Sequence, residues 1–208
     1  MKHASFLIGI ALAAILLLGC SQEKDTGYPD PRAILHNPLV AEQHADMTLD
    51  YLSSLQIRAD ERSEPITDPA ILRAIDDAFV WARKLQDEAH AAQDQGKKGV
   101  AYGVNENFAI GEVLHTDGAL YFDPNFEVSA APKMKLYLAQ HVSPHAVEEL
   151  FSEPTIEIGD LRSIYGAQMY PMQKLTNDEW NKYRTVAFYS EPLNQVIALV
   201  QIRGLVKQ

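Results

Sequence analysis

The hydrophobic pattern along the chain changes its period twice. An uninterrupted apolar stretch, residues 4–18, follows the N-terminal Met-Lys-His. Apolar residues then recur at helical spacing over residues 39–98, and from residue 102 onward they recur with a period of two. Because a period near 3.6 indicates helix and a period of two indicates strand, the pattern predicts a leader, a helical segment and a β domain in that order.

Two helices are predicted in the segment 39–98, and both have the same kind of start. Asn37-Pro38 precedes the first and Asp68-Pro69 precedes the second. A capping side chain followed by proline, which has no amide hydrogen to satisfy, is typical of a helix N-terminus. The first helix is predicted to run to about residue 57, and the second to stop at Gly96-Lys97-Lys98-Gly99, since helix C-termini favour glycine and cations. We expect the apolar stripe of each helix to pack against the domain that follows.

One β domain is predicted over residues 102–206. Asp117-Gly118 is a hairpin turn by composition, and residues 143–150 are predicted to form a short helix. The strand candidates are residues 108–115, 119–122, 133–139, 155–158, 185–189 and 195–202. Many short strands separated by glycine and proline are typical of a sandwich or barrel. The predicted fold class is therefore α+β, a short N-terminal helical segment packed on a mainly antiparallel β-sandwich or barrel.

The apolar leader ends in Leu17-Leu18-Gly19-Cys20. A positive start, an apolar region of about 15 residues and a small residue at the end describe a secretory signal peptide, residues 1–19, which is too short to span a membrane comfortably. Leucine, a small residue and then cysteine resemble the lipobox of bacterial lipoproteins, in which the cysteine becomes the lipidated first residue of the mature chain. We therefore expect a covalent lipid on Cys20 and an extracytoplasmic location; a plain secretory signal and an uncleaved anchor are the alternatives.

A tether is predicted between the lipid and the first helix, over residues 20–38. The segment holds one glycine and three prolines among polar residues, with little apolar content. In lipoproteins generally, serine after the cysteine goes with sorting to the outer membrane of Gram-negative cells, and Ser21 stands at that place. We expect the protein to face the periplasm from the outer membrane if the cell is Gram-negative.

The net charge of the chain limits which classes of partner it can bind. The chain has 18 Lys and Arg against 28 Asp and Glu. Removal of residues 1–19 takes away Lys2 and no acid, so 17 cations remain against 28 acids and the mature formal charge is −11. A chain this acidic repels phosphate backbones, so we expect no nucleic-acid partner.

The single cysteine limits the chemistry further. If Cys20 carries lipid, the folded part holds no thiol, which excludes an internal disulfide, a cysteine-ligated metal and covalently attached haem. His141 and His145 have the four-residue spacing of zinc ligands on a helix, but Ser143-Pro144 between them disfavours helical geometry. Ser190-Glu191 lacks the Gly-x-Ser-x-Gly elbow of hydrolases. We expect no catalytic residue, no metal site and no cofactor besides the lipid.

A ligand or partner cleft is the remaining kind of site that the β region can offer. Tyrosines on strands usually fill cores with the hydroxyl near the rim, and a cluster of them can also serve recognition. The candidate cleft residues are His115, Tyr121, Tyr189 and Ser190.

Three segments of the β region resemble the DM13 domain family, in the family's order. These segments are Ala131–Leu138, the run from Ile158 to Pro171 with its Gly166-Ala167-Gln168-Met169-Tyr170 core, and Tyr183–Ser190. The match spans about residues 104–204. It implies a compact β-sandwich module, one proposed in the family to serve redox or electron transfer through a cysteine near the end of the penultimate strand. Ser190 stands at that position here, and a hydroxyl cannot form the thiolate that such chemistry requires.

The function we predict is a non-enzymatic, lipid-anchored binding module of the cell envelope. Its partners would be the membrane, through the lipid, and an envelope protein or a small ligand. Extracytoplasmic electron transfer, implied by the DM13 resemblance, is the alternative. A structural role in envelope assembly, in which the two helices hold a partner, is a third hypothesis.

Overall fold

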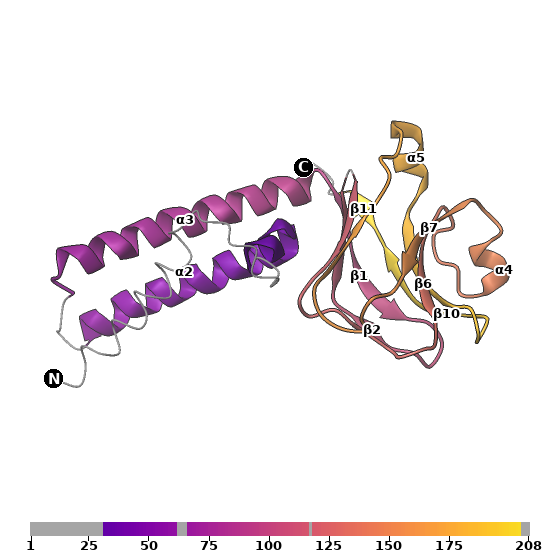
Figure 1. Ribbon diagram of the computed structural model, residues 1–208, viewed down its shortest axis with the longest axis horizontal. Coiled ribbons are helices and arrows are strands. Elements are labelled where there is room, and N and C mark those ends of the chain that lie inside the picture. The colour runs from indigo at the N-terminus through magenta and orange to yellow at the C-terminus, as the bar shows by residue number, and fades with distance from the viewer. Residues whose placement is uncertain (1–30, 62–65, 117, 205–208) are drawn as a thin grey trace, which may run out of the picture.

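The computed structural model describes residues 31–61, 66–116 and 118–204, and these form a helical hairpin attached to a β domain (Figure 1). A short 3₁₀ helix, η1 (Pro31–His36), leads into α2 (Pro38–Glu61), and α3 (Pro69–Asp94) runs back along it. The remaining elements belong to the β domain. The predicted α+β class is confirmed. Among the described residues, no helix combines the length and the hydrophobicity needed to cross a bilayer.

Both helix starts are capped as predicted. Asp68 accepts a hydrogen bond from the amide of Ala70 (2.8 Å), and Pro69 is the first residue of α3. Asn37 accepts from the amide of Leu39 (3.1 Å), and its own side-chain amide donates to the carbonyl of Phe122 (2.8 Å) in the β domain. The Asn37 cap therefore also fastens the start of α2 to the β domain.

The two helices bury their apolar stripes against each other, which corrects the expectation that each stripe packs on the following domain. Helix α2 contacts α3 along its length, and the hairpin meets the β domain only at one end (Figure 1). The buried residues of this interface are mostly small: Ala41, Ala45, Leu52, Ala78, Ala82 and Ala89. Small side chains allow two helices to approach closely. Trp81 packs edge-on against His44 at 5.7 Å, and Val80 points to solvent with 69% of its surface exposed.

The β domain is an antiparallel sheet that curls almost into a barrel (Figure 1). Its order is β7-β6-β9-β10-β1-β3-β4-β8, so β7 and β8 are the two edges that face each other across the opening. The two-residue strand β11 (Arg203–Gly204) pairs with β1 in this sheet. The two-residue strands β2 (Ala109–Ile110) and β5 (Glu127–Val128) pair with each other in a separate small sheet. The long strands are β1 (Lys97–Gly103), β3 (Glu112–Thr116), β4 (Ala119–Phe122), β6 (Met134–Ala139), β7 (Thr155–Asp160), β8 (Gln168–Pro171), β9 (Thr185–Ser190) and β10 (Gln195–Gln201).

Aromatic side chains fill the centre of the curled sheet. Phe122, Phe126 and Phe188 are almost completely buried, with ring centroids 4.6–5.9 Å apart. Tyr170 adds a fourth ring, 5.5 Å from that of Phe122. The short helix α4 (Val147–Leu150) covers a second cluster on the outer face, where Leu150 packs with Tyr137 and Ala187. The interior of the β domain is therefore a packed core.

Three local predictions need correction. The predicted strand 108–115 is divided at Gly111, which has φ +100° and ends β2 so that β3 can start in a new direction. The second helix does stop before Gly96 as predicted, because α3 ends at Asp94 with Gln95 as its C-cap, but the predicted role of the lysines is wrong, since Lys97 and Lys98 belong to β1. The predicted helix 143–150 shrinks to α4. The Asp117-Gly118 turn does connect a hairpin, since Thr116 pairs with Ala119, although Asp117 itself lies outside the described residues.

Candidate functional site

One end of the β domain is covered by a short helix that the sequence pattern did not predict, α5 (Asn177–Lys182) (Figure 1). Thr176 caps it by accepting from the amide of Glu179 (3.3 Å), and the Glu179 carboxylate accepts from the amide of Thr176 (2.9 Å) in return. The backbone amide and the hydroxyl of Thr176 both donate to this carboxylate, and the two hydrogen bonds lower the pKa of Glu179. Reciprocal capping of this kind stabilises a short helix locally.

Beneath α5, Lys97 and His115 lie opposite each other on β1 and β3. Both side chains are buried, with 7% and 1% of their surface exposed. The indole of Trp180, on α5, stacks on the imidazole of His115 with 4.5 Å between the ring centroids. The ammonium of Lys97 lies 5.0 Å from the centroid of the same indole. Trp180 therefore covers a pair of basic side chains at the end of the barrel.

Lys97 also holds the C-terminal end of α5. Its ammonium donates to the carbonyl oxygen of Trp180 and to that of Tyr183 (3.2 Å). Carbonyl groups at a helix C-terminus carry partial negative charge, so a cation there is favourable. Burial lowers the pKa of Lys97, and the nearby positive charge of Arg184 lowers it further. Lys97 thus stabilises the end of α5, while its burial disfavours the charged form of its own ammonium group.

A hollow of about 430 Å³ opens beside α5, and we call it the cationic hollow. Three cations and two amides contribute to its wall, and no carboxylate does. Arg184 precedes β9, and Arg203 belongs to β11, so both are fixed by the sheet next to β1. The lining residues are Lys97, Val142, Asn181, Arg184, Gln201, Ile202 and Arg203.

A second hollow, of about 350 Å³, lies where the edges of β7 and β8 face each other, and we call it the seam groove. Its wall mixes apolar and polar side chains. The apolar ones Ile156, Ile158, Met172 and Leu175 are partly buried against the core. Glu157, Gln173 and Lys174 are among the polar ones. Glu179 and Tyr183 also line it, so α5 stands between the seam groove and the cationic hollow.

Side chains close the other end of this seam. The Tyr170 hydroxyl accepts from the amide of Arg162 (2.8 Å) and donates to the side chain of Gln168 (2.7 Å). The Arg162 guanidinium lies over the Tyr170 ring, 4.8 Å from its centroid, and Gln168 donates to the carbonyl of Ser163 (2.9 Å). These contacts, which we call the Tyr170 clasp, stand where hydrogen bonds between two strands would otherwise be expected.

The four predicted cleft residues do not come together. His115 alone lies under α5. Tyr121, half-buried on β4, pairs across the sheet with Leu114 and Met169. Tyr189 donates its hydroxyl to Asn194 (3.0 Å), and its ring packs against Tyr137 and Phe151 at 6.1 and 5.6 Å. Ser190 is buried at the opposite end of the barrel and donates to the carbonyl of Pro132 (2.7 Å).

Two other features considered from the sequence have a structural explanation. His141 and His145 lie in the loop after β6, where Ser143 donates its amide to His141 (3.3 Å) and its hydroxyl lies 3.0 Å from the ring nitrogen of His145. Within the described ranges, no group of three or more His, Cys, Asp or Glu side chains is placed to hold a metal ion. Cys20, with the predicted signal peptide, lies outside the residues that the structure describes.

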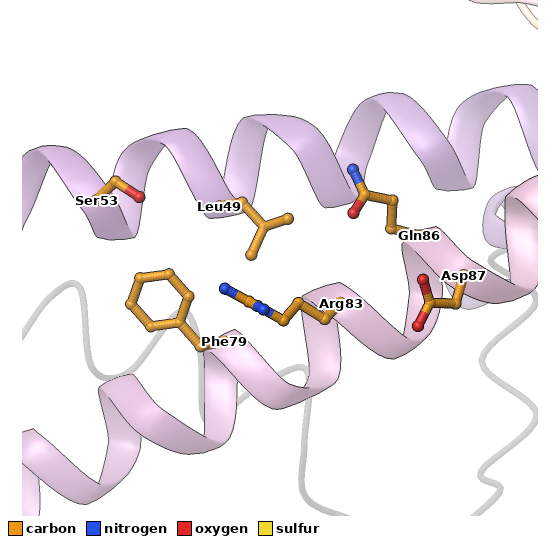
Figure 2. Close-up of a pocket in the computed structure, with 6 residues that line it drawn as sticks. All are labelled: Leu49, Ser53, Phe79, Arg83, Gln86 and Asp87. Carbon is orange, nitrogen blue, oxygen red and sulfur yellow. The ribbon is translucent and has the colours of Figure 1, made fainter.

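A third hollow, of about 310 Å³, lies between the two helices of the hairpin and is shown in Figure 2. Leu49 and Ser53 on α2 face Phe79 and Arg83 on α3, and Arg83 extends along the gap between the helices (Figure 2). Its walls carry one cation and one acid, Asp87, next to apolar groups. Charge is therefore not concentrated here as it is beside α5.

Sequence reasoning missed most of the residues at the α5 end. Lys97 was assigned to a helix terminus, and Trp180, Arg184 and Arg203 were assigned no role. The Thr176-x-x-Glu179 capping box was a readable signal for α5. The cationic hollow had no such signal, because its residues come from segments about 100 positions apart. Comparisons with family models, curated proteins and solved structures find no match to this chain.

Proposed function

We propose that the protein is a lipid-anchored, extracytoplasmic binding module that meets its partner at the α5 end of the β domain and catalyses no reaction. The lipid on Cys20 would attach it to the membrane, and the tether would be shorter than the predicted 20–38, since η1 and the start of α2 take residues 31–38 into the fold. The observation that carries the proposal is the arrangement around α5, where a groove of mixed apolar and polar side chains and a cluster of cations flank one short helix.

The two hollows have the composition that recognition requires. Binding sites combine apolar walls, which supply burial, with a few polar groups that fix orientation. The seam groove offers both apolar and polar side chains, and the cationic hollow adds three charged groups on the other side of α5. Because the centre of the barrel is filled by aromatic rings, a ligand would bind at this end rather than inside.

We keep the resemblance to the DM13 family as a proposal about ancestry, without its electron-transfer role. In the place of the family's cysteine, the Ser190 hydroxyl is buried and bonded to the carbonyl of Pro132. A serine held in this way stabilises the chain locally and has no thiolate to offer.

Site-specific photo-crosslinking in the host cell tests the proposal. A photoreactive amino acid replaces Gln173, which is exposed at the seam groove, and in a matched variant it replaces Val80, which is exposed on the hairpin. We expect a discrete crosslinked product from position 173 and none of the same mass from position 80. Equal labelling from both positions, or no product from position 173 in a folded, membrane-associated protein, would contradict a binding surface at the α5 end.

A further inference from the structure

The cationic hollow contrasts with the charge of the whole protein. The chain carries a formal charge of −10, yet three cations line one hollow to which no acid contributes. Lys84, Lys98 and Lys135 form ion pairs with acids elsewhere in the described part of the chain, and none of these three lysines lines this hollow. Gathering like charges is unfavourable unless an opposite charge offsets it. Such a cluster indicates a place for an anion.

The sheet fixes where these cations stand. The backbone amide of Arg184 donates to the carbonyl of Ala139 (3.0 Å), and its carbonyl accepts from the amide of Ile202 (2.8 Å). Arg203 pairs with Lys98 in the β1–β11 ladder. Lys97 is held by the two carbonyls at the end of α5. The backbone positions of all three are therefore set by folding, before any ligand arrives.

Hydrogen-bonding groups accompany the charges. A guanidinium nitrogen of Arg203 donates to the side-chain amide oxygen Oε1 of Gln201 (3.1 Å), which also lines the hollow. Guanidinium groups present several N–H donors in a planar fork that matches the oxygens of phosphate and carboxylate. Asn181 adds another amide. A volume of about 430 Å³ lies within the range of small-molecule sites.

We infer that the cationic hollow binds a small, multiply charged oxyanion of the phosphate or polycarboxylate class, held by Arg184, Arg203 and Lys97. Three cations favour an anion with two or more charges over a singly charged one. The acidic surface of the rest of the chain repels nucleic acid and anionic lipid surfaces, which favours a free small molecule. This inference rests on the proposed function and names the chemical class of its ligand.

Calorimetric titration of the full-length, detergent-solubilised protein with inorganic phosphate, at constant ionic strength, tests the inference. We expect saturable binding of phosphate and weaker binding of acetate. Arg184→Gln and Arg203→Gln should each weaken phosphate binding by about tenfold or more, since each removes a charged donor. Arg73→Gln, which removes one exposed cation from α3, is the matched control and should leave the affinity unchanged.

The outcomes separate this inference from the proposed function. The same phosphate affinity in Arg184→Gln and Arg73→Gln, or heat that chloride reproduces, would overturn the anion site. If crosslinking at position 173 succeeds and phosphate does not bind, the binding module stands and the anion site is wrong. Phosphate binding that depends on Arg184 supports the site even if no crosslink forms. The unfolding midpoints of both arginine variants, expected to equal that of the parent, ensure that lost binding is not lost folding.

Discussion

At the scale of single residues, the β domain buries one cationic and one anionic side chain, and burial shifts their pKa values in opposite directions. Lys97 lies under α5, and Asp123 lies in the turn after β4 with 9% of its surface exposed. Burial raises the pKa of Asp123; backbone hydrogen bonds from Glu112, Asn125 and Phe126 oppose the shift, and the charge of Glu112 adds to it. The ionisation of Lys97 and that of Asp123 therefore each make the free energy of unfolding depend on pH.

The contribution of Asp123 to the free energy of unfolding decreases as pH rises. A carboxyl whose pKa is higher in the folded state than in the unfolded state binds more protons when folded, so its contribution is largest below its ordinary pKa of 3.8 and is lost as pH rises through the raised folded value. Asp123→Asn removes this loss. We expect the stability of Asp123→Asn, relative to the parent, to be greater at pH 7 than at pH 4.

Urea unfolding at both values of pH measures this difference, with Glu106→Gln as a control for the removal of one exposed acid. A relative stability of Asp123→Asn that stays constant, or falls, between pH 4 and pH 7 would show that burial of Asp123 does not raise its pKa.

Residue-scale prediction from the sequence succeeds where the partner is local. The caps at Asn37 and Asp68 could be predicted, because each accepts from an amide two residues further on. The contact between His115 and Trp180 could not be predicted, because the two residues are 65 positions apart and no periodicity connects them. Tyr189 and Ser190 are neighbours whose side chains leave the strand on opposite faces, so a shared cleft was not available to them.

At the scale of elements, the bend at Gly111 decides the path of the β domain. A side chain there would place its Cβ 2.5 Å from the Cα of Phe126, and the φ of +100° is one that glycine alone adopts readily. The sequence pattern predicts strand on both sides of Gly111, because aromatic or β-branched residues occur in both halves of the segment 108–115. It cannot show the bend, since a single glycine also occurs within continuous strands.

Substitution of this glycine should be costly. We expect Gly111→Ala to lower the free energy of unfolding by at least about 3 kcal/mol, because strain at positive φ and a backbone clash add together. Gly166→Ala is the matched control, since Gly166 also has a positive φ (82°) but has open space around the position of a Cβ. Its cost should stay near 1–2 kcal/mol, the strain alone. Equal losses in urea unfolding would mean that the contact with Phe126 is unimportant.

The hairpin depends on alanines between its helices. Ala82 is completely buried there, and Ala91 is exposed on the same helix. Ala82→Leu should destabilise the hairpin by about 1–3 kcal/mol, because the added carbons have no space between the helices. Ala91→Leu adds the same carbons on the solvent side and should change little. Thermal unfolding followed by helical circular dichroism compares the two, and an unchanged midpoint for Ala82→Leu would contradict close helix packing.

At the scale of the whole molecule, the α+β class and most strands could be predicted from the sequence, since they depend on periodicity. The order of strands and the covering of one end by α5 could not, because they depend on contacts between distant segments. The strands 185–189 and 195–202 illustrate the first case. Arg184 and Arg203, which only the folded sheet brings to one hollow, illustrate the second.

The location of the protein in the cell also concerns the whole molecule. If the lipid on Cys20 is the membrane anchor, Cys20→Ala in the full-length chain should move the protein from the membrane fraction to the soluble fraction of the cell envelope. Fractionation with immunodetection, alongside the unchanged protein, measures this. An unaltered membrane fraction, or an unmodified N-terminal segment by mass spectrometry, would contradict the anchor.

The place where α2 begins has a consequence for how the molecule would sit on a membrane. Asn37 ties the start of α2 to Phe122, so the chain enters the fold at the junction between the hairpin and the barrel. A lipid upstream would attach the molecule near this junction rather than at the far end of the hairpin or of the barrel. From there α2 extends outward for about 36 Å, at about 1.5 Å per residue over 24 residues. The far end of the hairpin and the α5 end would then be free to contact different envelope proteins at the same time.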